Sequence, residues 1–337
     1  MAATWLVEQG IGETRAALVD GGTILAARLD WHPGLAPGLV APARVASRHA
    51  GTRRGMVEFA DGGVAMVDGL GADLPEGASG LFRITRAAIA ERGRTKLPVA
   101  RPAAPGEEPR AAPSLAEQLA ATGQPVRVLH AADPALDQAG WEDLMDEAAS
   151  GDVAFARGAL CISPTPAMTL IDVDGIPPLP GLAMAAAPAI AAAIMRLDIG
   201  GSIGIDFPTL AEKRDRQAAD AALAEALATL GAHTGWRGER TAMNGYGFVQ
   251  LVARLERPSL PAMAMRHPLG AAARRLLRRA ERVREPGALL LTCHPTLAKA
   301  LRPEWQEELA RRTGRTLRWS LDETLAPTAG FAQAITL

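Results

Sequence analysis

The hydrophobic pattern is clearest around two short apolar runs that each end in an acid. Thr169-Leu-Ile precedes Asp172, and Ile203-Gly-Ile precedes Asp206. Short β-branched runs bounded by turn residues are typical of buried strands. The Ala-rich segment between them, residues 182–197, favours a helix. This part of the chain therefore predicts a strand–helix–strand unit.

Such a unit constrains where the two acids lie. A strand–helix–strand connection is right-handed and sets its strands parallel in one sheet. Asp172 and Asp206 would then leave the sheet at its C-terminal edge, where open sheets of this kind bind ligands. A lone aspartate at a strand end often forms a turn or caps a helix. Two matched acids favour a cation instead, and oxygen ligands alone favour a hard ion such as Mg²⁺.

The first half of the chain alternates short strand patterns with turn signals. Strands are expected at 4–7, 14–19 and 23–29, and several short strands between 39 and 97 predict a small barrel. Residues 98–113 are rich in Pro, Ala and charge and predict a mobile linker. Ser114 and Glu117 have the spacing of a capping box, which predicts a short helix. A strand at 126–129 and an acidic helix at 134–149 follow.

The second half contains a hairpin, a long helix and a basic helix. The hairpin, 155–163 with 167–171, leads into Asp172, and the long helix covers 210–230. Strands are expected at 240–243 and 247–255, and the chain ends as strand, helix and strand. Arginines recur at helical spacing in the amphipathic segment 271–284. We expect this arginine face to be solvated, with contact to RNA phosphates as the alternative.

Composition narrows the class of protein. The chain has 337 residues, enough for two or three domains, and a net charge of -1, so any basic surface must be local. Its two cysteines, Cys161 and Cys293, allow no disulfide framework and no four-cysteine zinc site. Neither a secretory signal nor a convincing membrane span is visible. We therefore expect a soluble, cytoplasmic protein that does not bind a membrane.

Several of these motifs together resemble the ribonuclease E/G family of bacterial endoribonucleases. The segment 12–19 is similar to the opening strand of that family. The segment from Gly158 through Asp172-Val-Asp174 resembles its hairpin and Ile-Asp-Val-Asn signature, and 198–207 resembles its second signature. Arg257-Pro-Ser-Leu260 and Cys293-His-Pro295 fit more weakly. The resemblance covers most of the chain, is strong over 158–260 and is faint between 98 and 150.

The resemblance implies a mixed α/β (α+β) fold with several parts. A ribonuclease-H-like subdomain (1–38) would be interrupted by an oligonucleotide-binding (OB-type) barrel (39–97), with a linker and helical remainder at 98–150. A deoxyribonuclease-I-like catalytic subdomain would follow at 151–262, and a C-terminal α/β segment at 263–337.

The resemblance also implies a function. The two family aspartates that bind Mg²⁺, for which Mn²⁺ can substitute, map onto Asp172 and Asp206, and the assisting Asn maps onto Asp174. The implied reaction is endonucleolytic hydrolysis of single-stranded RNA by metal-activated water, which leaves 5′-phosphate and 3′-hydroxyl ends. The residues that we expect to contact RNA are basic or aromatic: Lys213, Arg214, Arg216, Tyr246, Arg274 and Arg278.

The sequence departs from the family at several of its motifs. Asp174 adds a third acid, and Gly175-Ile-Pro-Pro-Leu-Pro180 should stiffen the loop beside the metal. The family Ser-Arg-Phe-Gly motif is Asn244-Gly-Tyr-Gly247 here and lacks the Arg. No Arg-Thr motif for a 5′-monophosphate is found before residue 150. The paired cysteines of a zinc-linked dimer are missing, so no such dimer is expected.

Two other functions compete with the nuclease. One is a noncatalytic RNA-binding protein of the same fold, for example in ribosome maturation, which the lost Arg and the proline-rich loop favour. The other is a metal-dependent phosphoesterase for a small substrate, in which the barrel would have no evident purpose.

Overall fold

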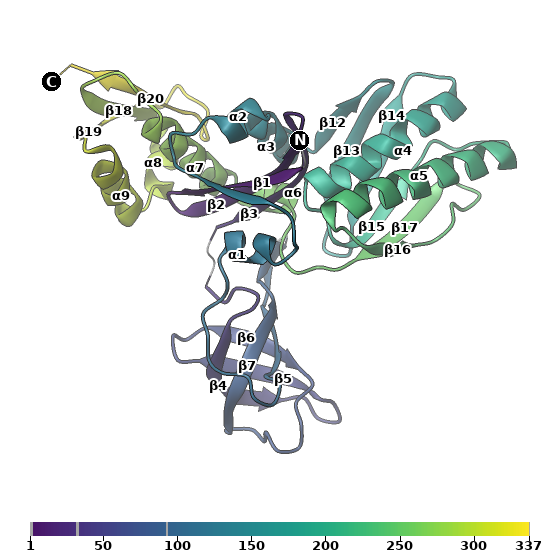
Figure 1. Ribbon diagram of the computed structural model, residues 1–337, viewed down its shortest axis with the longest axis horizontal. Helices are drawn as coiled ribbons and strands as arrows, with labels where there is room; N and C mark the ends of the chain where they lie inside the picture. The colour runs from purple at the N-terminus through teal and green to yellow at the C-terminus, as the bar shows by residue number, and fades with distance from the viewer. Residues whose placement is uncertain (1–2, 32–33, 92–93, 337) are drawn as a thin grey trace.

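The computed structural model describes residues 3–31, 34–91 and 94–336 as a mixed α/β protein with several sheets and a closed barrel (Figure 1). The mixed α/β class expected from the sequence is therefore confirmed. The barrel projects from a body in which the six-stranded sheet and the C-terminal unit lie at opposite ends.

The N-terminal sheet has the strand order β11-β1-β2-β3. Its strands are β1 (Thr4–Gly10), β2 (Glu13–Asp20), β3 (Thr23–Asp30) and β11 (Val126–Leu129). Helix α1 (Leu115–Ala120) packs Leu115 and Leu119 against this sheet, and its capping box between Ser114 and Glu117 is present as expected. Because β11 pairs with β1 in parallel, the barrel is an insertion between two strands of one sheet.

The barrel is closed by a strand that the sequence did not indicate. Its strands are β4 (Val40–Arg48), β5 (Arg54–Phe59), β6 (Val64–Asp68), β7 (Ser79–Arg86) and β10 (Val99–Pro102). β10 lies in the segment expected as a mobile linker, but it pairs with both β6 and β7. The linker prediction is wrong at these residues, because pairing on both sides holds β10 in the barrel wall. A hairpin of β8 (Ile89–Glu91) and β9 (Arg94–Lys96) precedes β10.

The expected acidic helix at 134–149 is two helices, α2 (Ala135–Gln138) and α3 (Trp141–Ser150). Gly140 separates them because it adopts φ 94°, a left-handed conformation that interrupts an α-helix. The break turns α3 so that Trp141 is fully buried in the main core.

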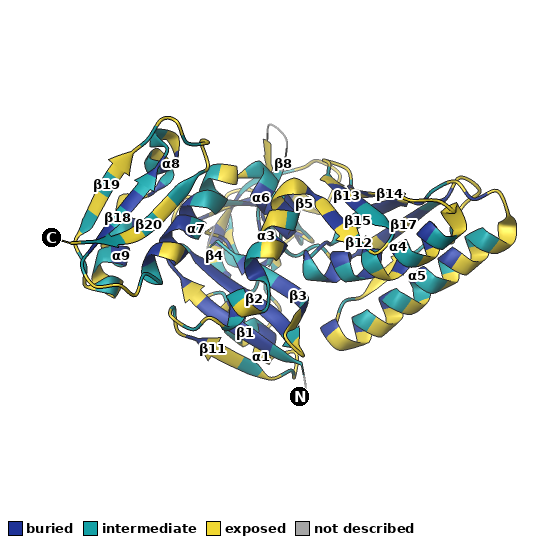
Figure 2. Cartoon of the chain, turned by 90° about the horizontal axis from the view of Figure 1, so that it is seen from above, coloured by how far each residue is buried: buried dark blue, intermediate teal, exposed yellow. Residues whose placement is uncertain are grey.

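The six-stranded sheet has the order β12-β13-β14-β15-β17-β16. Its strands are β12 (Asp152–Phe155), β13 (Gly158–Pro164), β14 (Thr169–Gly175), β15 (Gly201–Asp206), β17 (Phe248–Ala253) and β16 (Gly238–Arg240). Helices α4 (Leu179–Arg196) and α5 (Lys213–Thr234) lie along one face (Figure 2). α4 is long and apolar enough by composition to cross a membrane, but its buried residues, such as Ile190 and Ile194, belong to the main core.

The C-terminal unit is a three-stranded sheet with helices packed on it. Its strands are β18 (Ala288–Cys293), β19 (Leu317–Leu321) and β20 (Gly330–Ile335). Its helices are α7 (Pro268–Glu281), α8 (Pro295–Ala300) and α9 (Pro303–Thr313), and α6 (Leu260–Arg266) connects it to the six-stranded sheet. The unit has its own core of buried residues, including Leu277, Leu289 and Leu291.

Arginines of α7 dock this unit on the rest of the chain. Arg278 pairs with Glu13 of β2, and its Nη2 donates to Glu142 of α3 at 3.1 Å. Arg275 also pairs with Glu142. Burial acts to raise the pKa of the Glu142 carboxyl, but the positive charges of Arg278 and Arg275 outweigh it and hold that pKa below its ordinary value. The Glu142 carboxylate is therefore a charged link between α3 and α7.

Replacing Glu142 by Gln should lower the free energy of unfolding by about 1–3 kcal/mol near neutral pH, because Arg275, Arg278 and Arg279 each lose one charged acceptor. A carboxyl with a depressed folded pKa stabilises the protein above its ordinary pKa, and this contribution is lost as the pH falls through the folded value. The difference between wild type and variant should therefore shrink in acid. Urea unfolding at neutral and acidic pH measures it.

The exposed Glu304, 3.8 Å from Arg302, offers a matched control for this test. Glu304→Gln should change the free energy of unfolding by less than about 0.5 kcal/mol. A Glu142→Gln effect as small as that of the control, or one that persists unchanged in acid, would contradict the assigned role.

Candidate functional site

The six-stranded sheet has one covered face and one open face. Along β14 and β15, Ile171, Val173, Ile203 and Ile205 are buried in the main core beneath α4 and α5. Side chains alternate between faces along a strand, so the residues between these lie on the other side. They include exposed acids of both strands, Asp172, Asp174 and Asp206.

Asp172 and Asp206 are direct neighbours across the sheet. β14 and β15 pair in parallel with Asp172 opposite Asp206, as the strand–helix–strand unit predicts. Neighbouring strands lie about 4.8 Å apart, so two side chains on the same face at matched positions are adjacent. Asp174 lies on the same face, two residues further along β14 than Asp172 and therefore beyond the end of β15. The structure thus brings all three sequence-predicted acids to one edge.

Within the described residues, no basic side chain neutralises these acids. Asp172 accepts a hydrogen bond from the backbone N–H of Val173 at 3.0 Å, and none of the three carboxylates forms an ion pair with a residue that the structure describes. Two unit charges about 4 Å apart interact by roughly 1 kcal/mol in water and roughly 4 kcal/mol near a protein surface. The juxtaposition of Asp172 and Asp206 is therefore unfavourable unless a cation offsets it.

The available ligands fit a hydrated hard cation better than a closed metal site. Across the part of the chain that the structure describes, no three or more His, Cys, Asp or Glu side chains are grouped to hold a metal. Structural zinc sites need four such ligands. Mg²⁺ commonly uses one or two carboxylates and keeps several of its waters. Asp172 and Asp206 provide the two carboxylates that such a Mg²⁺ site uses.

Two contacts fix the segments that lead into the acids. After α4 the chain turns at Asp198, which has φ 52° and pairs with Arg28 of β3 at 3.1 Å, before β15 begins. Beyond Asp174, Arg157 donates hydrogen bonds to the carbonyl oxygens of Ile176 and Pro177. The proline-rich loop is thereby tied to the β12–β13 turn next to the acid-bearing end of β14, whereas the Asp198 contact fixes the start of β15 at the opposite end.

The basic residues expected after Asp206 lie at the start of α5. Lys213 and Arg214 are exposed, and Arg214 has a partner at 3.6 Å in Asp215. Arg216 instead donates to the carbonyl oxygens of Leu210 and Ala211, so it closes the turn before its own helix. Because α5 follows β15, Lys213 and Arg214 lie at the acid-bearing edge of the sheet.

Tyr246 belongs to the turn that leads into β17. It is 82% exposed, and Asn244 Oδ1 accepts hydrogen bonds from the backbone N–H groups of Tyr246 and Phe248. Gly247 has φ 92°, and a Cβ there would lie 2.6 Å from the carbonyl oxygen of Phe207, so only glycine fits. This turn places an exposed aromatic ring near the acids without any role in the core.

Arg274 and Arg278 do not lie on an exposed basic surface. Each is only 6% exposed. The Arg274 guanidinium lies between the rings of Trp31 and Trp305 and donates to the carbonyl oxygen of Gly12. Arg278 is held by Glu13 and Glu142, as described above. The expectation of a solvated arginine face is wrong at these two positions, and neither side chain is open to RNA, because both dock the C-terminal unit.

The register also places residues beside the acids that the sequence analysis did not select. One row across the open face reads Asp152, Cys161, Asp172, Asp206 and Phe248. Cys161 is exposed, whereas Cys293 is buried. The hairpin and β17 were both expected, but sequence alone does not give the residue-by-residue pairing that aligns them with the acids.

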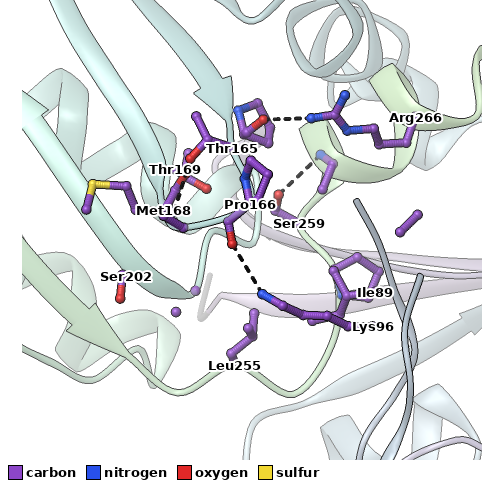
Figure 3. A pocket seen from close by; sticks show the side chains of 17 residues that line it. Ile89, Lys96, Thr165, Pro166, Met168, Thr169, Ser202, Leu255, Ser259 and Arg266 are labelled. Carbon is purple, nitrogen blue, oxygen red and sulfur yellow. Dashed lines mark hydrogen bonds between the residues drawn. The ribbon is translucent and has the colours of Figure 1, made fainter. Parts of the chain in front are cut away.

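A polar pocket lies at the other end of the same strands (Figure 3). It is bounded by the β8–β9 hairpin, the turn at 164–168 and α6. Lys96 donates to the carbonyl oxygen of Pro166 at 3.3 Å, and Arg266 donates to that of Pro164 at 2.9 Å. None of the described residues that line it is acidic, so its charge is opposite to that of the Asp172 edge.

Comparison of the chain with models of known protein families found no match, and comparison with curated proteins found none either.

The different burial of the two thiols predicts different reactivity. Cys161 should be alkylated by iodoacetamide in the folded protein, and Cys293 only after unfolding, because only the first thiol is accessible. Mass spectrometry of peptides after timed alkylation measures both. Equal protection of the two thiols would mean that the face carrying Asp172 is covered in solution.

Proposed function

We propose that the protein is a magnesium-dependent endoribonuclease that cleaves single-stranded RNA in the cytoplasm. The observation that carries this proposal is the pairing of Asp172 with Asp206 on the open face of the sheet, without a basic partner among the described residues. The resemblance of both segments to the ribonuclease E/G signatures supports it independently of the geometry.

The chemistry follows from the ligands. Asp172 and Asp206 would hold Mg²⁺, or Mn²⁺ in its place, through one or more carboxylate oxygens. When bound, such an ion polarises a phosphoryl oxygen and lowers the pKa of a coordinated water. Asp174, on the same face, would orient the attacking water or accept its proton. Lys213 and Arg214 would stabilise negative charge on the phosphoryl oxygens. The water oxygen would remain on the 5′-phosphate, and the leaving oxygen would become the 3′-hydroxyl.

The arrangement of the sheets supports the finer fold assignment. An N-terminal sheet interrupted by a barrel between β3 and β11 is what a ribonuclease-H-like subdomain with an inserted OB-type barrel would require. OB-type barrels have five strands, as this one does. The sheet carrying α4 and α5 would be the deoxyribonuclease-I-like catalytic part.

Asp174 favours a second candidate, a noncatalytic RNA-binding protein of the same fold. A third carboxylate on the acid-bearing face repels a phosphate that approaches the metal. This candidate predicts RNA binding that weakens steeply with salt and no cleavage in the presence of Mg²⁺.

Wild-type protein should cleave a labelled single-stranded RNA in Mg²⁺ and lose cleavage in EDTA. Asp172→Asn and Asp206→Asn should each lower kcat by more than the roughly 10- to 100-fold that removal of an outer-shell partner costs. Each variant removes one charged ligand with little change in volume. Gel analysis of the products, with chemical identification of their 5′ and 3′ ends, measures the reaction.

Asp152→Asn is the matched control, because Asp152 is exposed on the same face but lies two strands from Asp172 and three from Asp206. It should retain cleavage. Equal cleavage by wild type, Asp172→Asn and Asp206→Asn would remove the two acids from the mechanism. RNA binding without any metal-dependent cleavage would favour the noncatalytic candidate.

A further inference from the structure

Three apolar side chains meet over Gly204 in the centre of the open face. A Cβ built on Gly204 would lie 2.7 Å from Phe248 Cζ, 2.9 Å from Leu170 Cδ2 and 3.0 Å from Met168 Sδ. These side chains therefore reach over a backbone position that has no side chain of its own. We call Met168, Leu170 and Phe248 the Gly204 platform.

The Gly204 platform is next to the acids and partly open to solvent. Phe248 is paired directly with Asp206, and Leu170 precedes Asp172 by two residues, roughly 7 Å along the strand. Leu170 is 38% exposed, and Phe248 and Met168 are half-buried. An aromatic ring and two flexible apolar side chains thus form a small surface beside the candidate metal ligands. Burial under α4 and α5 does not explain them, because those helices cover the opposite face.

The two sides of the Gly204 platform differ in charge: one is acidic and the other is basic. At one end, Asp172 and Asp206 need a cation, which in turn attracts phosphate. At the other end lies the pocket of Figure 3, which shares Met168 with the platform and contains Lys96 and Arg266. Thr165, Ser202 and Ser259 add hydroxyl groups to its wall. Along β14 the surface therefore offers a phosphate-attracting end, an apolar centre and a basic pocket.

We propose that the Gly204 platform stacks a base of a single-stranded RNA, whose backbone runs along β14 from the acid-bound cation to the Lys96–Arg266 pocket. This inference rests on the proposed function for the identity of the ligand and adds the residues that hold it. A charged backbone that passes beside a stacked base matches a surface that is charged at both ends of β14 and apolar in its centre. Only an unpaired base can offer its face to a side chain, so the site selects single strands over duplexes.

The contribution of the Phe248 ring to RNA binding can be measured by substituting Phe248 alone. Phe248→Ala should weaken the Kd for a short, fluorescein-labelled single-stranded RNA by about 5- to 150-fold, the range expected for loss of one base–aromatic stack. Binding is measured by fluorescence anisotropy in Ca²⁺, a hard divalent cation that fills the cation end of the site. Gel analysis verifies that the RNA stays intact, so that binding does not depend on cleavage. In Mg²⁺ the same variant should raise KM and leave kcat nearly unchanged. Phe248→Leu keeps an apolar side chain for packing and should still bind weakly.

Val252→Ala is the matched control, because Val252 lies on the same strand and face, is 53% exposed and is outside the platform. It should bind RNA as wild type does. Lys96→Gln should reduce the slope of log Kd against log salt by about 0.7, the value for one phosphate contact to a single strand. Thermal unfolding identifies any variant that is simply misfolded, in which case Phe248→Leu decides the question.

The outcomes separate this inference from the proposed function. If Phe248→Ala and Phe248→Leu bind RNA as wild type does while Asp172→Asn abolishes cleavage, the platform assignment is wrong and the nuclease stands. If wild type cleaves no RNA but both Phe248 variants still bind it more weakly, the platform stands and catalysis does not. Failure of wild type to bind single-stranded RNA, or equal binding of duplex RNA, would overturn the inference, and the face would then fit a protein partner better.

Discussion

The parallel pairing of β14 with β15 is the constraint on which the candidate site depends. It aligns Asp172 with Asp206, whereas a slip of one residue in either strand would turn its acid toward the core. Burial of Ile171 and Val173 on β14, and of Ile203 and Ile205 on β15, beneath α4 and α5 prevents that slip. The same register aligns Phe248 with Asp206 from the other side. Core packing on one face thus determines the chemistry of the other.

Several arginines of this chain form buried ion pairs inside the protein rather than a basic surface for RNA. The buried Arg15 binds Glu8 at 3.0 Å, and Arg282 binds the same carboxylate at 2.9 Å. The Arg15–Glu8 pair lies within the N-terminal sheet, whereas Arg282 on Glu8 and Arg278 on Glu13 and Glu142 join α7 to that sheet and to α3. Removing one partner of a buried pair typically costs about 3–5 kcal/mol, because a charge is left uncompensated. The basic helix is therefore an internal connection between the C-terminal unit and the rest of the body.

Local patterns predicted most elements, and pairing between distant segments accounts for what they missed. Short β-branched runs and the Ala-rich segment were sufficient for β14, α4 and β15, and hence for the adjacent acids. The brief strand β10 was hidden in a proline-rich segment because only its barrel neighbours stabilise it. Burial of Arg274 and Arg278 depends on acids and aromatic rings far away in the chain, such as Glu13 and Trp305. The cluster at Gly204 likewise required the strand register.

The central claim is that Asp172 and Asp206 share one divalent cation. Its most direct test is a crystal soaked in Mn²⁺, measured at a wavelength where manganese scatters anomalously. The account predicts an anomalous peak between the two side chains, within about 2.0–2.2 Å of an oxygen atom of each, at distances close to those of Mg²⁺. A soaked crystal with no peak there, or with manganese bound by only one of the two carboxylates, would contradict it.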